Sequence, residues 1–252
     1  MGSRKFWTEG WGSFAVAIFI ALVIRWGLFE AYVIPSASML PSLLIHDHIF
    51  VNKAVYGIRV PFSEQWLVRF AKPKRGDVIV FKYPKDMNVF FIKRVIGLPG
   101  DKIMYDNGKL ILNGKPVETT QNELGYDWEA VSDVDFRRDD EQNPNYAADV
   151  KANYNHFTEK LPDHEHSILL RKEDFFGRTE GPWLVPAGQL FMMGDNRDNS
   201  HDSRRWGFLP EENILGRAMF VWLSCAETLP KPVNFVCNPL NIRWNRFFHD
   251  VN

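Results

Sequence analysis

The longest apolar run in this chain lies close to its amino terminus and constrains the fold more than any other feature. Residues 11–34 read WGSFAVAIFIALVIRWGLFEAYVI, which approaches the ~20 residues that a helix needs to cross a bilayer. The strictly apolar centre, Phe14 to Ile24, is short. Arg25 interrupts the run, but near one end a long cationic side chain can reach the headgroups. We therefore expect a single transmembrane helix over residues 11–33.

The residues on either side of this run decide between a span and a removed leader. A cleaved signal peptide is the alternative, because a basic start followed by an apolar run also describes one. No small-x-small cleavage site in a polar setting follows before Pro35, which favours the span. Arg4 and Lys5 precede the run, so the positive-inside rule places residues 1–10 in the cytoplasm. The rest of the chain is expected on the extracytoplasmic side.

Composition excludes several classes of protein. The chain has 252 residues, enough for one core with a large insertion. It carries 30 Lys and Arg against 31 Asp and Glu, so a general nucleic-acid binder is not expected. Cys225 and Cys237 are too few for a disulfide framework or a zinc site. A single bridge between them and a pair of free thiols both remain open.

The chain beyond Pro41 has the texture of short strands. Runs of β-branched and aromatic residues end at Pro or Gly, and Asp106-Asn107-Gly108 has the composition of a hairpin turn. Helical periodicity is scarce outside the apolar run, so we predict a mainly β fold after it. The expected strands are Val78–Phe81, Asn88–Gly97, Lys102–Tyr105, Lys109–Leu112, Gln189–Met193 and Ala218–Leu223.

Residues 116–182 differ in texture from the rest, being polar and weakly periodic. We expect an insertion domain with few strands, placed between two parts of the catalytic core at residues 34–115 and 183–252. A disordered linker is the alternative, but disordered segments seldom carry so many aromatic residues. These are Trp128, Phe136, Tyr146, Tyr154, Phe157, Phe175 and Phe176.

Ser38 is the candidate nucleophile. It lies between Pro35 and Pro41, which fix φ locally and push the residues before them out of the α region. The intervening segment should therefore be extended and then turned, so that a hydroxyl can stand clear of the backbone. The alternative is a turn that merely ends a membrane helix.

Lys93 is the candidate base. It lies in a predicted strand of apolar residues and shares a face with Phe91 and Val95, because side chains alternate across a strand. An amine in apolar surroundings loses solvation of its charged form, which lowers its pKa. The alternative is that Lys93 faces water while Arg94 is buried in an ion pair.

Metal chemistry is not expected. His46-Asp47-His48 and His164-Glu165-His166 each place two histidines on one side of an extended segment, but a third ligand is not evident. We interpret both as solvated loop histidines. Residues 195–202 do not match a calcium loop, because Arg197 and Ser200 stand where an oxygen ligand and a glycine are required.

Five sequence blocks stand out when the chain is taken in order. They are Pro-Ser-x-Ser-Met-x-Pro at 35–41, Val51-Asn52-Lys53 with Tyr56-Gly57, the run 74–81, the run 92–101, and residues 194–207. Together these blocks closely resemble bacterial signal peptidase I. The resemblance implies a membrane-anchored serine endopeptidase with a Ser/Lys dyad on a mainly β, antiparallel fold that carries an N-terminal transmembrane helix and an inserted second domain. Such enzymes remove signal peptides from exported preproteins after small-x-small sites such as Ala-x-Ala.

The resemblance also implies a role for individual residues. Ser38 would be the nucleophile and Lys93 the general base. The Ser36 hydroxyl and the Ser38 N–H would form the oxyanion hole, and Ser200 would orient the dyad. Asp202, Arg204 and Arg94 would give structural support, while the substrate-binding residues would be Ile34, Met39, Leu43, Phe91 and Ile92.

The same resemblance sets the expected partners and location. We expect preprotein signal peptides and membrane lipids as partners, no cofactor, no metal, no nucleic acid, and a monomer. The protein would be single-pass in the bacterial inner membrane, with the catalytic domain on the periplasmic side. Two positions depart from the family pattern, because His46 stands where Gly is common and Ser42 where Thr is usual.

Two other functions remain open at this point. One is a self-cleaving, repressor-type enzyme with the same dyad, against which the apolar run and the lack of a helix-turn-helix argue. The other is a membrane-anchored binding protein without enzymatic activity.

Overall fold

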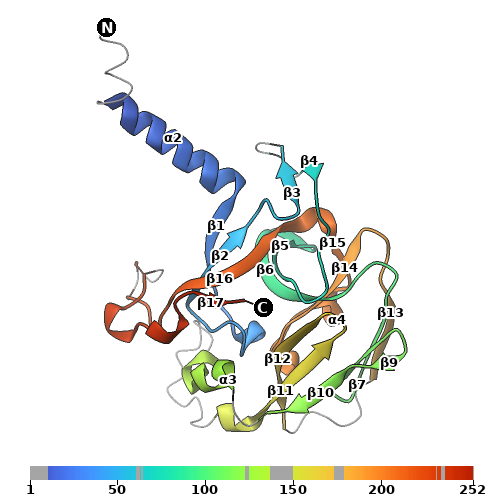
Figure 1. Cartoon of the computed structure of the whole chain (residues 1–252). Coiled ribbons are helices and arrows are strands. Elements are labelled where there is room, and N and C mark those ends of the chain that lie inside the picture. The colour runs from blue at the N-terminus through green and yellow to red at the C-terminus, as the bar shows by residue number, and fades with distance from the viewer. Residues whose placement is uncertain are drawn as a thin grey trace.

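The computed structural model describes residues 11–60, 63, 65–122, 125–136, 150–172, 179–230, 232–233 and 236–251. Strands dominate this part of the chain, so the mainly β prediction is confirmed. Figure 1 shows helix α2 (Trp11–Gly27) extending from a β body, with the carboxyl terminus lying against that body beside β16 and β17.

The largest sheet has eight strands and every pairing in it is antiparallel. Strand β6 is the longest at 12 residues, and its second half is buried. In order across the sheet the strands are β1 (Phe29–Val33), β2 (Asp47–Asn52), β16 (Ile214–Ser224), β5 (Val78–Tyr83), β6 (Asp86–Gly97), β14 (Gln189–Met193) and β15 (Leu209–Pro210), with β17 (His249–Asp250) paired to β16.

Three smaller sheets complete the β structure. The hairpin predicted at Asn107-Gly108 is confirmed, since both residues have positive φ and join two paired strands. The sheets are β13 (Thr179–Leu184), β7 (Lys102–Asp106), β8 (Lys109–Leu112) and β9 (Lys115–Pro116); β10 (Glu118–Gln121), β11 (Tyr154–Leu161) and β12 (His164–Arg171); and β3 (Gly57–Arg59) with β4 (Trp66–Arg69).

The expectation of few strands in residues 116–182 is wrong. Strands β10, β11 and β12 form a sheet there, and β13 pairs with β7 of the core. Polar and charged side chains occupy buried positions of β11 and β12, including Glu159 and His166. The sequence therefore lacks the alternation of apolar and polar residues that predicts a half-buried strand.

The amino-terminal helix is shorter than predicted. Helix α2 ends at Gly27, whereas a transmembrane helix was expected over residues 11–33. Residues Phe29–Val33 instead form β1, whose backbone groups pair with β2 in register from Phe29 opposite Asn52 to Val33 opposite His48. Among the residues that the structure describes, no helix has both the length and the apolar character needed to cross a membrane.

Short helical turns connect the strands. Two of them, η1 and η4, lie at the candidate site, and α4 follows it along the chain. The turns are α3 (Tyr126–Ala130), α4 (Ser203–Trp206), η1 (Ala37–Met39), η2 (Asp133–Phe136), η3 (Lys151–Asn153), η4 (Arg197–Asn199), η5 (Glu211–Asn213), η6 (Pro239–Asn241) and η7 (Trp244–Arg246).

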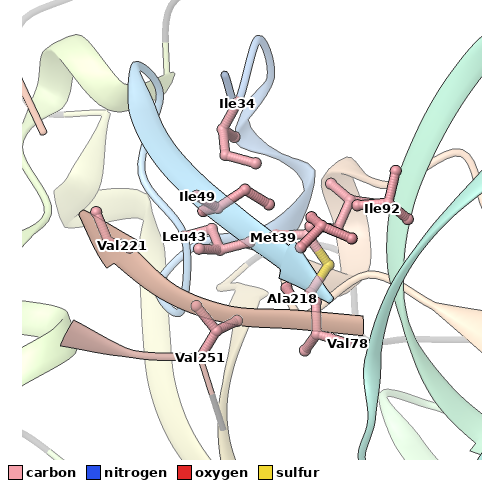
Figure 2. Close-up of a cluster of buried hydrophobic side chains, with 11 residues drawn as sticks. Ile34, Met39, Leu43, Ile49, Val78, Ile92, Ala218, Val221 and Val251 are labelled. Atoms are coloured by element: carbon pink, nitrogen blue, oxygen red, sulfur yellow. The ribbon is translucent and has the colours of Figure 1, made fainter. Parts of the chain in front are cut away.

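Buried apolar side chains pack on both sides of the turn that carries Ser38. Figure 2 shows one cluster, in which Met39 and Leu43 from the turn region pack against Ile49 of β2 and Ile92 of β6. A second cluster joins Ala37 and its neighbours to Phe136, Tyr154 and Leu169 of the insertion. The turn is thus fixed by the central sheet on one side and by the insertion on the other.

The open question about the cysteines is answered by the structure. Cys225 and Cys237 form a disulfide across 12 positions of sequence. His48 lies beside the bridge, with its Nε2 3.4 Å from the Cys237 sulfur.

Candidate active site

The segment around Ser38 has the predicted shape. Ser36 is extended, with φ −145° and ψ 155°, and the next three residues form the single turn η1. The carbonyl of Ala37 accepts a hydrogen bond from the N–H of Leu40, which closes the turn. Ser38 is only 8% exposed, yet it borders a cavity, so its hydroxyl is shielded but reachable.

Lys93 lies directly opposite this hydroxyl. Its Nζ is 2.6 Å from Ser38 Oγ and 2.8 Å from the carbonyl oxygen of Ile92. The residue is 4% exposed, and its amine lies 5.5 Å from the centroid of the Phe91 ring. Strand β6 therefore brings together two side chains that are 55 residues apart in sequence.

Burial lowers the pKa of the Lys93 amine from its ordinary value to about 8, because the charged form loses its solvation. The carboxylates of Asp202 and Asp195 oppose this shift, since each favours a nearby positive charge. The net result is an amine that is neutral in a large fraction of molecules near pH 8 and can accept a proton.

The alternative in which Lys93 faces water is wrong. Both Lys93 and Arg94 are buried, on opposite faces of β6. Arg94 makes a bidentate ion pair with Asp195, at 2.9 and 2.8 Å. Ser42 donates to the same carboxylate at 2.6 Å. The position where Ser stands in place of the usual Thr therefore supplies a buried hydrogen bond.

Asp202 and Arg204, from which the resemblance implied structural support, form an ion pair at 2.8 Å. Asp202 also accepts from the N–H of Gly194 at 3.0 Å, and Arg204 donates to the Arg197 carbonyl at 2.6 Å. Burial alone would raise the pKa of Asp202, but the charge of Arg204 and the hydrogen bonds from Arg204 and the Gly194 N–H outweigh it and lower that pKa. The pair therefore braces the loop from Gly194 to Arg204.

Ser200 is close to the dyad but is not hydrogen-bonded to Lys93 in this structure. Its Oγ is buried, and the hydroxyl is among the groups that lower the pKa of Asp202. A Cβ on Gly194 would come within 2.3 Å of Ser200 Oγ and 2.4 Å of the Ser38 carbonyl oxygen. The backbone of Gly194 thus packs directly between Ser200 and the nucleophile turn.

The Ser36 hydroxyl lies next to that of Ser38, the candidate nucleophile. Its Oγ is 3.3 Å from Ser38 Oγ, which brings the two predicted oxyanion-hole residues together. Because Ser36 is exposed while Ser38 is buried, the Ser36 side chain lies on the open side of the turn.

A cavity of about 940 Å³ opens at the dyad. Five of the predicted site residues line it, and strand β6, the Ser38 turn and the insertion supply its walls. Ile34, Met39 and Leu43 do not line this cavity but pack with Ile92 in the adjoining apolar cluster (Figure 2). The lining residues are Pro35, Ser36, Ala37, Ser38, Val89, Phe90, Phe91, Ile92, Lys93, Phe136, Val150, Asn153, Tyr154, Arg171, Asn199 and His201.

Sequence reasoning assigned no role to Asn196. This fully buried residue donates from its backbone N–H to the Ser38 carbonyl at 3.2 Å and from its side-chain amide to the Ala37 carbonyl at 3.1 Å. Its place in residues 194–207, the last of the five sequence blocks, was the signal that could have found it.

Three of the four histidines that we interpreted as solvated loop residues lie in strands and are buried or half-buried. His48 is buried in β2 and His166 in β12, while His164 is half-buried in β12. His46 has φ +64°, a conformation that favours glycine, which accounts for Gly being common at this position in the resembled family. Buried polar partners, rather than water, surround His166.

Comparison with known proteins agrees with this geometry. A family model described as signal peptidase, peptidase S26, matches residues 7–223. A signal peptidase I from Pseudomonas fluorescens is 42% identical over 226 residues, which cover 85% of this chain and 72% of the relative. One from Buchnera aphidicola subsp. Acyrthosiphon pisum (strain APS) is 40% identical over 227 residues, with coverage of 82% and 72%.

A solved structure of a signal peptidase I from Enterococcus faecalis V583 is 27% identical, has a TM-score of 0.31, and covers 58% of this chain and 97% of that chain. The family assignment rests on the family model and on the two relatives of high coverage. The chain therefore belongs to the signal peptidases of family S26, serine peptidases that remove signal peptides from exported proteins.

Proposed function

We propose that this signal peptidase uses Ser38 as its nucleophile and Lys93 as its general base. The observation that carries the proposal is the 2.6 Å separation of Lys93 Nζ and Ser38 Oγ, two buried side chains that line the cavity. A buried amine with a lowered pKa can take the hydroxyl proton, so no histidine is needed.

In the first step, Ser38 Oγ attacks the carbonyl carbon of the scissile peptide bond while its proton moves to the neutral Lys93 amine. The tetrahedral oxyanion then collapses, the C–N bond breaks, and the new ammonium returns the proton to the leaving amine of the mature protein. Water next attacks the acyl-enzyme, with Lys93 again accepting and returning a proton. The signal peptide leaves with a free carboxylate and Ser38 is restored.

Two donors are available for the oxyanion. The Ser36 hydroxyl lies beside Ser38 Oγ, and the backbone N–H of Ser38 belongs to the same turn. Each donor aimed at the developing charge contributes roughly 3–4 kcal/mol to the stabilisation of the transition state. Loss of the Ser36 hydroxyl should therefore lower kcat much more than it changes KM.

The substrate binds as an added strand beside the half of β6 that leads to Lys93. Residues 89–92 line the cavity, and the segment Val33 to Pro35 approaches from the other side, where Tyr32 and Phe90 rings lie 6.3 Å apart. Ile92 borders the cavity and is packed against the buried side chains of Ile34, Met39 and Leu43, so this side of the cavity favours a small side chain before the cleaved bond, which fits Ala-x-Ala sites (Figure 2).

The proposal also places the enzyme at a membrane. Several apolar side chains of α2 are exposed, including Trp11 at 84%, Phe14 at 69% and Phe19 at 67%. Such a surface is unfavourable in water and suits lipid. Flotation of the full chain with vesicles tests this point, and a chain that stays in the aqueous fraction would contradict it.

The deciding experiment is cleavage of an Ala-x-Ala preprotein in detergent by the wild type and by Ser38→Ala and Lys93→Ala. Both variants should lose cleavage, and Lys93→Arg should also be inactive because a guanidinium stays protonated at working pH. Matched controls are Ser63→Ala and Lys102→Ala, which remove the same groups at exposed positions away from the cavity. Near-wild-type kcat in Lys93→Ala would require another base.

A further inference from the structure

Three buried ion pairs each have at least one member in the loop from Gly194 to Arg204, which packs against the Ser38 turn. Each guanidinium is within 2.8 Å of its carboxylate, and no side chain in the set is more than 7% exposed. Two of the pairs belong to the core, whereas one carboxylate comes from the insertion. The pairs are Arg94 with Asp195, Arg204 with Asp202, and Arg197 with Glu159.

The third pair links the insertion to the loop from Gly194 to Arg204. Glu159 lies on β11 and binds Arg197 of η4 through two hydrogen bonds, at 2.7 and 2.6 Å. Arg197 Nε donates in turn to the Gly194 carbonyl at 3.2 Å. Since Gly194 packs against both Ser200 and Ser38, the position of the loop at the dyad depends on this pair.

The three ion pairs carry no net charge among themselves, because three guanidinium groups face three carboxylates. The carboxylate of Asp195 acts on both Lys93 and Arg197, so the two cations lie within the electrostatic range of one carboxylate. Protonation of Lys93 therefore adds an uncompensated positive charge to a region shielded from water. An added or removed charge elsewhere in the cluster should change the cost of that protonation.

Two histidines are in contact with these pairs and stay uncharged near pH 8. His166 Nε2 lies 3.4 Å from Glu159 and 3.9 Å from Asp195, and burial together with Arg94 lowers its pKa well below the ordinary value. His164, 3.0 Å from Arg94, has a pKa lowered by burial as well.

Two further groups lie close to Arg197 and Arg204. Burial raises the pKa of Tyr105 to about 12, and its ring lies 4.9 Å from the Arg204 guanidinium. Asp198 is half-buried and accepts from the N–H of Arg171 at 2.8 Å, at the edge of the cluster.

We propose that Glu159 is a positioning residue of the peptidase, which by neutralising Arg197 holds the loop from Gly194 to Arg204 and sets the pH range in which Lys93 acts as base. This inference rests on the proposed role of Lys93. It gives the inserted sheet a part in the reaction, because a residue that does not line the cavity controls the charge around the dyad.

The test is the pH dependence of kcat/KM for preprotein cleavage in three variants. Glu159→Gln leaves Arg197 uncompensated, which disfavours protonated Lys93, so the acidic limb of the profile should move to lower pH. Arg197→Gln leaves a carboxylate uncompensated, and the limb should move to higher pH. Each shift should be about half a unit to one unit, and the double variant should return to the wild-type position.

Glu165→Gln is the matched control. Glu165 lies on β12 of the same inserted sheet, but it is exposed and faces Lys160 at 3.7 Å. Its profile should overlay that of the wild type. If the role of Glu159 were purely structural, Glu159→Gln would lower kcat/KM by the same factor at every pH and would not shift the acidic limb of the profile. That result, or shifts of both single variants in the same direction, would overturn the proposal.

The comparison does not depend on one fragile variant. If Glu159→Gln fails to fold, Arg197→Gln and the double variant still differ only at Glu159, so the second must have its limb at lower pH than the first. Lys93→Ala distinguishes a failure of the proposed base from a failure of the proposed role of Glu159. Retained activity in Lys93→Ala contradicts the proposed base, whereas unchanged limbs with an inactive Lys93→Ala contradict only the role of Glu159.

Discussion

The backbone N–H of Asn196 donates to the carbonyl oxygen of Ser38, across 3.2 Å. In the same loop, the carbonyl of Asp195 accepts from the N–H of Leu169 in the insertion at 2.9 Å. The loop after β14 is therefore held between the nucleophile turn and the inserted sheet. Three segments far apart in sequence meet at this point, and each fixes the position of the next.

Asn196→Ala should lower activity through the position of Ser38. The substitution removes the 3.1 Å hydrogen bond to the buried Ala37 carbonyl, which keeps its bond from the Leu40 N–H, at a cost of about 0.5–1.5 kcal/mol. The backbone bond to Ser38 persists, so we expect a folded protein with kcat reduced about tenfold or more and a smaller change in KM. Asn155→Ala, on β11 and outside the cavity, is the control; equal kcat in both variants would contradict this role for Asn196.

Cleavage should depend on pH through Lys93. Only the neutral amine can accept the Ser38 proton, and burial places its pKa at about 8. The value of kcat/KM should therefore rise as pH increases through about 8 and level off above it. Steady-state assays between pH 6 and about 10, where Lys in model peptides still titrates, check this expectation. A flat profile over that range would exclude a titrating amine as the base.

The free energy of unfolding should also depend on pH through Lys93. The pKa of Lys93 is about 8 in the folded protein against 10.5 for the ordinary side chain, so the unfolded chain binds more protons between these values. The contribution of Lys93 to the free energy of unfolding should then rise with pH across this interval, by up to about 3 kcal/mol. Denaturant unfolding of the wild type and of Lys93→Met at pH 7 and 10 isolates the effect. The difference in stability between them should change with pH in favour of the wild type; a constant difference would mean that the pKa is not lowered.

The strands of the core could be predicted from sequence because apolar residues alternate or run together there. The hairpin at Asn107-Gly108 followed from residue types that tolerate positive φ. Strands β11 and β12 could not be predicted in this way, since Glu159 and His166 occupy buried positions through partners that are remote in sequence. Pairing with β2 likewise takes Phe29–Val33 out of the helix that their hydropathy suggested.

The candidate site, like the fold, could be predicted from sequence only in part. Ser38 and Lys93 could be named from a proline-bounded turn, an apolar strand and the family resemblance. The bond from Asn196 to Ser38 and the salt bridge between Glu159 and Arg197 depend on how distant segments dock, which local patterns do not record. The Cys225–Cys237 bridge remained open for the same reason.

Ser42 should matter through its hydroxyl rather than its size. Its Oγ donates to Asp195 at 2.6 Å and accepts from Arg94 at 3.2 Å, so Ser42→Ala removes a donor from a buried carboxylate. Hydrogen bonds to charged groups contribute about 1.5–3 kcal/mol, and Tm should fall by several degrees together with activity. Ser42→Thr keeps the hydroxyl and should retain most of both. Calorimetry and cleavage assays measure the two effects, and a Ser42→Ala variant as stable as the wild type would show that Asp195 does not need this donor.

The disulfide should stabilise the carboxyl-terminal segment. Cys225 and Cys237 close a short loop of 12 positions, and a cross-link of this length restricts the unfolded chain by about 3 kcal/mol. The bridge lies against His48, whose backbone pairs with Val33 of β1, so its loss should also loosen the edge strand that leads to Ser38. We expect the Cys225→Ser, Cys237→Ser double variant to unfold at lower denaturant concentration and to lose part of its activity. Reduction of the wild type with a phosphine should reproduce the loss of stability and leave the double variant unchanged, because only the wild type has a bond to break. If reduction leaves the wild-type unfolding midpoint where it was, the bridge does not contribute to the stability of this segment.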